Sequence, residues 1–185
     1  AYVRRKLRFL YASGEEAILM PLIVTACRYD AARGVYDFLR LINTNFDSAS
    51  IQWSIGMMQK ELWQLETSCF WFEQVLLHPQ ADQSQRGRAF LELADAFIWR
   101  GVMLDKAVEY AKLALEFPDT NKNRAVTILI HGLIRSGQVQ QAQLYADQLG
   151  RDGDPEIIYL KGLIAYRNGD QQGAKTTWKP LLTKH

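Results

Sequence analysis

The sequence predicts an all-α protein, a solenoid of stacked antiparallel helix pairs, and three observations support this fold class. Apolar residues recur three and four positions apart along most of the chain, which is the spacing of one face of an α-helix. No convincing stretch alternates apolar and polar residues, as a half-buried strand would. One helix–turn–helix pattern returns along the chain, with its turns near residues 27, 63, 101, 137 and 169.

The composition is that of an ordinary globular domain. The 185 residues are 48% hydrophobic and 23% charged, which allows one sizeable core. The formal net charge is only +2, so no binding to nucleic acid is expected. The longest apolar run, residues 17–27, is too short for a bilayer span and contains Pro21. Cys27 and Cys69 lie among apolar residues and are predicted to be buried, reduced thiols.

Residues 1–13 form a short basic amphipathic segment ahead of a repeat domain that is predicted to cover residues 14–185. The segment is either the second helix of an incomplete repeat or a juxtamembrane stretch whose positive charge faces the cytoplasm. The sequence begins with Ala and ends inside its last predicted helix, without the polar capping helix that solenoids normally need. We therefore expect a domain of a longer chain, with a membrane tether upstream of residue 1, or an end that packs on another chain.

Five predicted helix pairs follow one another. Their turns are separated by 36, 38, 36 and 32 residues. Gly101, Gly137 and Gly169 supply the turn in the last three pairs, because glycine adopts positive φ without a steric penalty. The second pair has Trp63 at this place and the first has Cys27, so the register of these two pairs stays open. The pairs span residues 17–42, 51–79, 89–118, 125–149 and 156–182.

This period resembles that of the tetratricopeptide (TPR) repeat, a helix–turn–helix unit of about 34 residues. The resemblance covers nearly the whole chain and implies a right-handed superhelix whose concave face, lined by the first helix of each pair, binds partners. The residues that carry it are small residues at close helix approaches and turns, and two repeat-ending prolines: Gly56, Ala94, Gly162, Gly101, Gly137, Gly169, Ala32, Ala107, Ala142, Ala174, Pro79 and Pro118.

No motif predicts catalysis. Gly162, Gly169 and Gly173 follow a helical pattern and lack the spacing of a phosphate-binding loop, so they are interpreted as helix joints. The three histidines do not pair with other ligands at metal-binding spacing. We therefore predict a protein that is not an enzyme and uses no metal or cofactor.

Two further motifs receive structural interpretations. The stretch RDGDP, residues 151–155, lacks the length and the terminal Glu of a calcium loop. It is predicted to be a turn between repeats, with Asp154 or Pro155 starting a helix. The stretch CFWF, residues 69–72, is predicted to be core, because consecutive helical side chains point about 100° apart and cannot form one platform.

Helix spacing assigns residues to the concave face that the resemblance implies. They mix aromatic and aliphatic anchors with arginines, which suits a peptide or a partner helix. Arg124, Arg135 and Arg167 could form a positive stripe for an acidic peptide or a C-terminal carboxylate, although the Lys/Asn/Arg set of carboxylate-clamping TPR proteins is not present. The predicted partner-binding residues are Trp53, Met57, Lys60, Arg88, Leu91, Asp95, Ile98, Trp99, Arg124, Thr127, His131, Arg135, Tyr159, Leu163, Tyr166 and Arg167.

The leading hypothesis is a non-catalytic protein–protein interaction scaffold that docks a partner peptide or domain. By analogy alone, it would be the soluble, cytoplasmic part of a bacterial assembly, secretion or exopolysaccharide-export complex, tethered to the inner membrane. Two alternatives stay open. One is a structural repeat domain that forms homo-oligomers through uncapped ends near Leu181 and Leu182. The other is a helical-repeat regulator associated with nucleic acid, which the net charge of +2 disfavours.

Overall fold

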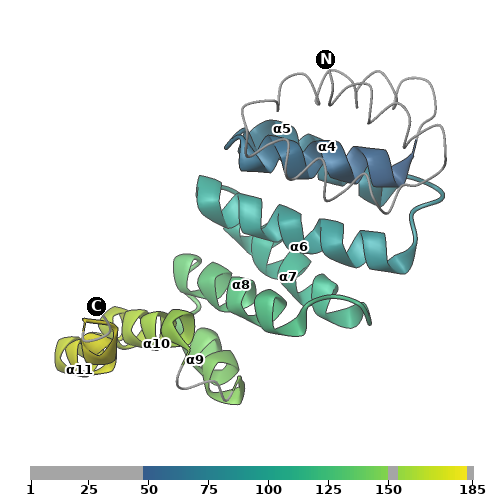
Figure 1. The fold of residues 1–185 in the computed structure, drawn as a ribbon. Coiled ribbons are helices and arrows are strands. Elements are labelled where there is room, and N and C mark those ends of the chain that lie inside the picture. The colour runs from purple at the N-terminus through teal and green to yellow at the C-terminus, as the bar shows by residue number, and fades with distance from the viewer. Residues whose placement is uncertain (1–47, 150–153, 183–185) are drawn as a thin grey trace.

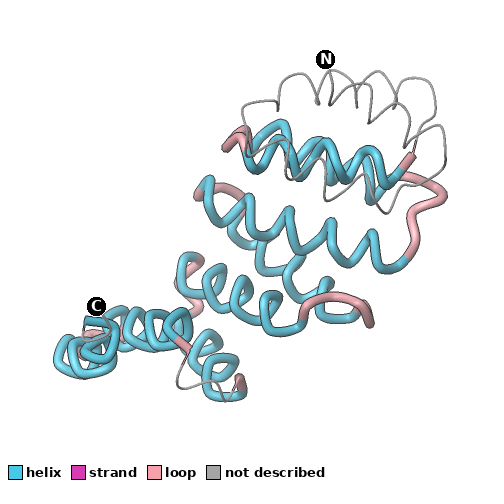
Figure 2. The backbone as a smooth tube through the Cα atoms, viewed as in Figure 1, coloured by secondary structure: helices cyan, strands magenta, loops and turns pink. Residues whose placement is uncertain are grey.

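The computed structural model describes residues 48–149 and 154–182, and within these ranges every element is an α-helix. The all-α prediction is therefore confirmed for this part of the chain (Figures 1 and 2). The predicted first pair, its turn near residue 27 and the basic segment 1–13 lie outside the described residues. The helices are α4 (Ala49–Glu61), α5 (Leu65–Leu77), α6 (Gln83–Arg100), α7 (Leu104–Glu116), α8 (Lys122–Arg135), α9 (Val139–Gln148), α10 (Pro155–Arg167) and α11 (Gln171–Leu182).

The helices pack as four successive pairs, each built from a first helix and the second helix that follows it. The pairs are α4 with α5, α6 with α7, α8 with α9, and α10 with α11. Each first helix also packs against the first helix of the next pair, so α4, α6, α8 and α10 follow one another across the molecule (Figure 1). We call the surface that these four helices present the first-helix face.

A residue in the left-handed conformation closes the turn inside each described pair. The φ angles are 58° at Trp63, 70° at Gly101, 82° at Gly137 and 85° at Gly169. Trp63 thus takes the place that glycine has in the other three pairs, and this fixes the register of the α4–α5 pair. This conformation costs a residue with a Cβ atom about 1–2 kcal/mol, whereas glycine adopts it without this penalty. The structure therefore holds a strained tryptophan at a glycine position.

Small residues lie where the helices approach most closely. A Cβ atom added to Gly56 would lie 2.7 Å from the Phe72 ring, and one added to Gly162 would lie 2.1 Å from Nε1 of Trp178. Ala107, Ala142 and Ala174 are buried in the later pairs, and Ser68 has the same role in the α4–α5 pair. These contacts explain the small residues that the sequence repeats.

The core prediction for residues 69–72 is correct for two residues and wrong for one. Cys69 and Phe72 are buried, and Cys69 is a free thiol. Phe70, in contrast, is 52% exposed, and its one ring contact among the described residues is a T-shaped one with Trp71. The reason is the helical geometry, because a residue two positions before Phe72 points about 200° away from it.

Side-chain caps mark where the first helices α6 and α10 begin. The Asp82 carboxylate accepts a hydrogen bond from the backbone N–H of Gln85, and the Gln85 side chain accepts one from the N–H of Asp82, which is a complete capping box at α6. Asp154 caps α10 by accepting from the N–H of Glu156, and Pro155 occupies the first helical position. The predicted helix start after residues 151–153 is therefore confirmed.

Candidate functional site

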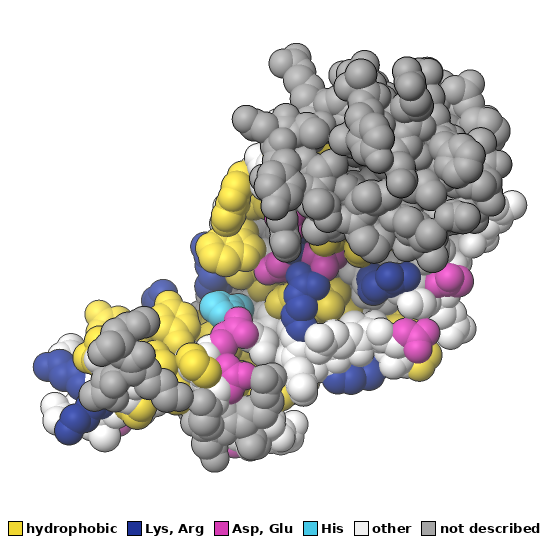
Figure 3. Space-filling view, viewed as in Figure 1, with side chains coloured by type: hydrophobic (Ala, Val, Ile, Leu, Met, Phe, Trp, Pro, Cys, Tyr) yellow, Lys and Arg dark blue, Asp and Glu magenta, His cyan; other side chains and the backbone are white. Residues whose placement is uncertain are grey.

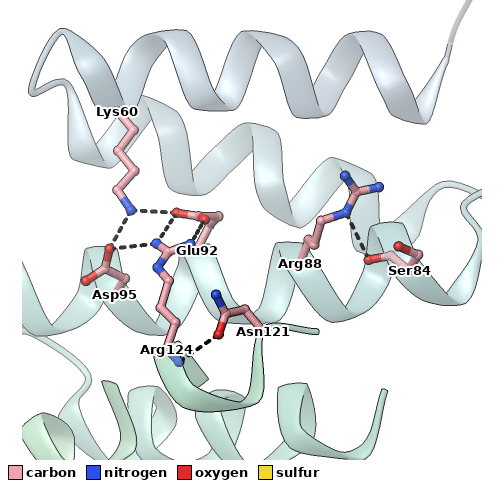
Figure 4. Close-up of polar contacts among 7 residues, drawn as sticks. All are labelled: Lys60, Ser84, Arg88, Glu92, Asp95, Asn121 and Arg124. Carbon is pink, nitrogen blue, oxygen red and sulfur yellow. Dashed lines mark hydrogen bonds and ion pairs between the residues drawn. The ribbon is translucent and has the colours of Figure 1, made fainter. Parts of the chain in front are cut away.

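Four charged side chains from three successive first helices meet on the first-helix face (Figure 4). Lys60 of α4 donates hydrogen bonds of 2.5 Å to Glu92 and to Asp95, both on α6. Arg124 of α8 donates to the two carboxylate oxygens of Glu92 at 2.5 and 3.0 Å, and to Asp95 at 3.2 Å. We call this set of Lys60, Glu92, Asp95 and Arg124 the charge cluster. Its formal charges sum to zero, and it bridges three helix pairs.

The Glu92 side chain lies at the centre of the charge cluster and is only 5% exposed. Burial would raise its pKa, but the hydrogen bond from Arg124 and the positive charges of Lys60 and Arg124 outweigh burial and hold the pKa of Glu92 below its ordinary value. Burial would likewise lower the pKa of Lys60, and the carboxylates of Glu92 and Asp95 raise it instead. The hydrogen bond to Glu92 also raises the pKa of Arg124. Glu92, Lys60 and Arg124 are therefore ionised at neutral pH.

These pKa shifts predict a dependence of stability on pH. Because the folded-state pKa of Glu92 lies below the ordinary value of 4.5, its contribution to stability is fully present above pH 4.5 and is lost as the pH falls through the lowered folded-state pKa. The free energy of unfolding of the wild type should therefore fall more steeply below about pH 5 than that of Glu92→Gln, whose amide does not titrate. Urea denaturation followed by circular dichroism measures both slopes, and parallel slopes would contradict this assignment.

A groove of about 440 Å³ lies beside the charge cluster, between α6, α8 and α10. Ile98 and Ile128 are buried along it, whereas Trp99 is 62% exposed and Tyr159 is 45% exposed. The face that contains the groove shows hydrophobic side chains beside a histidine, with charged side chains next to both (Figure 3). We call it the aromatic groove, and its lining residues are Asp95, Ile98, Trp99, Thr127, Ile128, His131, Arg135, Glu156, Tyr159, Leu163 and Arg167.

Aromatic rings continue beyond the groove on both sides. The Trp63 and Trp99 rings meet in a T-shaped arrangement, with an interplanar angle of 88° and a centroid distance of 6.0 Å. On the other side, the centroid of the Tyr159 ring lies 6.4 Å from that of His131 and 6.3 Å from that of Trp178. The apolar wall therefore extends from the α4–α5 turn to α11.

The charges at the two ends of the groove differ in sign. Glu156 lies in the first turn of α10, while Arg167 lies in the last turn of α10 and Arg135 in the last turn of α8. Between them, burial lowers the pKa of His131, and Arg135 adds to this effect while Asp95 opposes it. The imidazole is therefore neutral at neutral pH. A more polar hollow of about 420 Å³, lined in part by Asn121 and Asn123, continues the groove past Glu156.

The structure brings most of the predicted partner-binding residues to the aromatic groove. Helix spacing was sufficient to find them, because residues three, four and seven apart share one face. The predicted residues that line the groove are Asp95, Ile98, Trp99, Thr127, His131, Arg135, Tyr159, Leu163 and Arg167.

Other predicted residues lie elsewhere. Trp53 and Met57 of α4 are half-buried against the core, with the Arg88 guanidinium 5.3 Å from the centroid of the Trp53 ring. Leu91 is buried, and the Tyr166 ring packs near Trp178.

The predicted positive stripe is reduced by the charge cluster. Arg124 is held in ion pairs with Glu92 and Asp95, so only Arg135 and Arg167 of the predicted stripe lack an ion pair with a described residue.

Four residues of this surface are not among the residues predicted from the sequence: Glu92, Ile128, Glu156 and Trp63. A signal for Glu92 exists, because it lies four positions after Arg88 and three before Asp95 and must share their helix face. Glu156 lies three positions before Tyr159, which gives the same signal. For Trp63, the signal is a large aromatic residue where the last three repeats have glycine.

Comparisons with known proteins agree on the fold. No protein-family model and no curated protein sequence matches the chain. The crystal structure of YrrB, a TPR protein with an unusual peptide-binding site, is similar at a TM-score of 0.69 and 14% identity, over 92% of this chain and 87% of that one. The crystal structure of a Podosopora anserina putative kinesin light chain with nearly identical TPR-like repeats is also similar. Its TM-score is 0.70 and its sequence identity is 16%, over 98% of this chain and 95% of that one. The protein therefore has the superhelical fold of tetratricopeptide-repeat proteins, as its repeat period predicts.

Proposed function

We propose that the protein is a non-catalytic scaffold that binds a segment of a partner protein in the aromatic groove. The observation that carries this proposal is the pair of large exposed aromatic rings, Trp99 and Tyr159, over a buried apolar floor. Such rings supply a large contact area at a small cost in conformational entropy, and aromatic residues and arginines dominate binding energy at protein interfaces. The similar YrrB structure, described as having a peptide-binding site, supports a peptide as the kind of ligand.

The strained conformation of Trp63 supports the same proposal. Its side chain is 72% exposed, and its ring contact among the described residues is the T-shaped one with Trp99. Burial therefore contributes little to offset the cost of its left-handed backbone, and glycine at this position would make the folded state more stable. Strain that the fold does not explain is typical of functional surfaces. We infer that Trp63 extends the apolar wall of the groove for the partner.

A selection from a random library of short peptides tests the proposal. Peptides enriched on the wild-type protein should bind the Trp99→Ala/Tyr159→Ala variant at least tenfold more weakly, because hot-spot aromatic residues contribute about 2 kcal/mol or more each. The matched control is Phe70→Ala/Leu77→Ala, which removes two exposed apolar side chains of α5. The proposal fails if no peptide is enriched, or if the groove variant and the control bind the enriched peptides equally well.

Trp63→Gly should have opposite effects on stability and on peptide binding. We expect it to raise the free energy of unfolding by about 1 kcal/mol, because it relieves the left-handed strain, and to weaken peptide binding several-fold. Trp63→Ala should weaken binding equally without the gain in stability, because alanine keeps the strained Cβ. Chemical denaturation and fluorescence anisotropy measure the two effects. Unchanged affinity in both variants would remove Trp63 from the docking surface.

The cellular setting stays a prediction. We propose that the scaffold serves a larger assembly, secretion or exopolysaccharide-export complex at the cytoplasmic face of the inner membrane; this rests on analogy between repeat scaffolds. None of the helices in the described ranges has the length and apolar character needed to cross a bilayer. The division into residues 1–13 and 14–185 also stays a prediction.

The two alternative functions make different predictions. Self-association through the end of the chain predicts a mass that grows with protein concentration and decreases when the exposed Leu182 is made charged. A nucleic-acid regulator predicts binding that weakens steeply with salt. Analytical ultracentrifugation and a filter-binding titration at two salt concentrations distinguish both from a peptide-binding scaffold.

A further inference from the structure

We propose that the aromatic groove is polarised by charge and orients its partner, with an acidic side chain of the partner segment at Arg135 and Arg167 and a basic one at Glu156. This inference rests on the proposed function above and specifies its ligand. The ligand is an extended peptide segment with bulky apolar side chains between two opposite charges.

The basic end of the groove has hydrogen-bond donors available for a carboxylate. Arg135 and Arg167 project from the last turns of neighbouring helices, both are exposed, and neither forms an ion pair with a described residue. The Arg135 Nη1 atom donates to the backbone carbonyl of Ile98, which holds the guanidinium against the α6–α7 turn. A Cβ atom on Gly101 would lie 3.0 Å from Nη2 of Arg135, so the glycine turn leaves room for this group. Because a guanidinium carries five N–H donors, Arg135 keeps several for a ligand.

The acidic end depends on Glu156. It is exposed and has no ion-pair partner in the described part of the chain. Asp95 also lines this end, but Lys60 and Arg124 already neutralise its carboxylate. The polar hollow beyond adds the neutral amides Asn121 and Asn123. Glu156 is therefore the uncompensated charge at this end, and a basic side chain of the partner would complement it.

The length of the groove sets the spacing of the two charges. Glu156 and Arg167 are eleven positions apart on one helix, which corresponds to roughly 16 Å at 1.5 Å per residue. An extended peptide advances about 3.3 Å per residue, so its acidic and basic side chains should be about five residues apart. Between them, the neutral His131 and the rings of Trp99 and Tyr159 favour apolar side chains. A segment bound in the reverse direction would place like charges together at both ends.

Selection from the random peptide library tests the polarity. Peptides enriched on the wild type should share an acidic residue, a bulky apolar stretch and a basic residue, with the two charges about five residues apart. The variant Glu156→Lys/Arg135→Glu/Arg167→Glu should bind these peptides about tenfold more weakly and should enrich peptides with the opposite order of charges. All three positions are exposed, and circular dichroism checks that the variant is folded. The matched control, Glu109→Lys/Lys112→Glu, reverses two exposed charges on α7 and should enrich the wild-type pattern.

The outcomes separate this inference from the function on which it rests. If enriched peptides depend on Trp99 and Tyr159 but show no order of charges, the polarity is wrong and the scaffold function stands. The same conclusion follows if an acidic residue is enriched without a basic one. If no enriched peptide depends on the groove, both proposals fall. High salt should weaken the discrimination between the two orders, because these charges lie at an exposed rim.

Discussion

Replacing Glu92 with leucine is expected to lower the free energy of unfolding by about 3 kcal/mol. Glu92 is the common partner of Lys60 and Arg124, and its loss leaves two positive charges close together with only Asp95 between them. Breaking a buried ion pair typically costs about 3–5 kcal/mol. The lower end applies because the Arg124 side chain is 40% exposed and can turn toward water. Chemical denaturation followed by circular dichroism measures the loss.

A variant that removes every charge of the cluster is the informative control. Lys60→Met/Glu92→Leu/Asp95→Asn/Arg124→Met should recover most of the stability lost in Glu92→Leu, because no uncompensated charge remains among the three helices. The two variants would then show that the cost of Glu92→Leu lies in the orphaned cations. If the fourfold variant is as unstable as the single one, the ion pairs themselves stabilise the fold, and our explanation is wrong.

Gly162→Ala is expected to cost about 2 kcal/mol, although alanine is the better helix former. The new Cβ would lie 2.1 Å from Nε1 of Trp178, so the indole must move. That movement breaks the 2.9 Å hydrogen bond from Trp178 Nε1 to the carbonyl of Tyr159. Overpacking and the lost hydrogen bond together outweigh the gain of about 1 kcal/mol in helix propensity.

Gly162→Ala should also weaken peptide binding in the aromatic groove. Tyr159 both lines the groove and accepts the hydrogen bond from Trp178, so displacement of the indole should weaken peptide binding as well as stability. The double variant Gly162→Ala/Trp178→Leu makes room for the new Cβ and should cost less than the sum of the two single changes. Denaturation and tryptophan fluorescence measure the effect. Additive costs would show that the two residues do not compete for space.

Much of the fold and of the candidate surface can be predicted from local sequence. Gly101, Gly137 and Gly169 mark turns because positive φ favours glycine, and this holds whatever the neighbouring repeats do. The groove residues of α10 follow from the spacing of Tyr159 and Leu163 on one helix face. These predictions need only the geometry of one helix or one turn.

Contacts between repeats could not be predicted in the same way. Trp63 and Trp99 are 36 residues apart, and their contact depends on how far each helix pair is rotated against the next. The three-helix meeting of Lys60, Glu92 and Arg124 depends on the same rotation. Helix spacing alone therefore places Arg124 in a positive stripe, although Arg124 is paired with Glu92 and Asp95 in the structure. Local sequence fixes which face a residue is on but not what lies opposite.

The bridging of three helix pairs by the charge cluster determines how far a disturbance in one helix pair is transmitted along the solenoid. In an ordinary repeat array, each unit is stabilised only by its neighbours, so a frayed terminal unit leaves the unit after next unaffected. Here Glu92 and Asp95 share their oxygens between a cation from α4 and a cation from α8. Loss of α4 would leave two carboxylates on α6 with a single cation from α8. The state of the α4–α5 pair is thus coupled to α8, a wall of the aromatic groove, over a longer range than stacking alone provides.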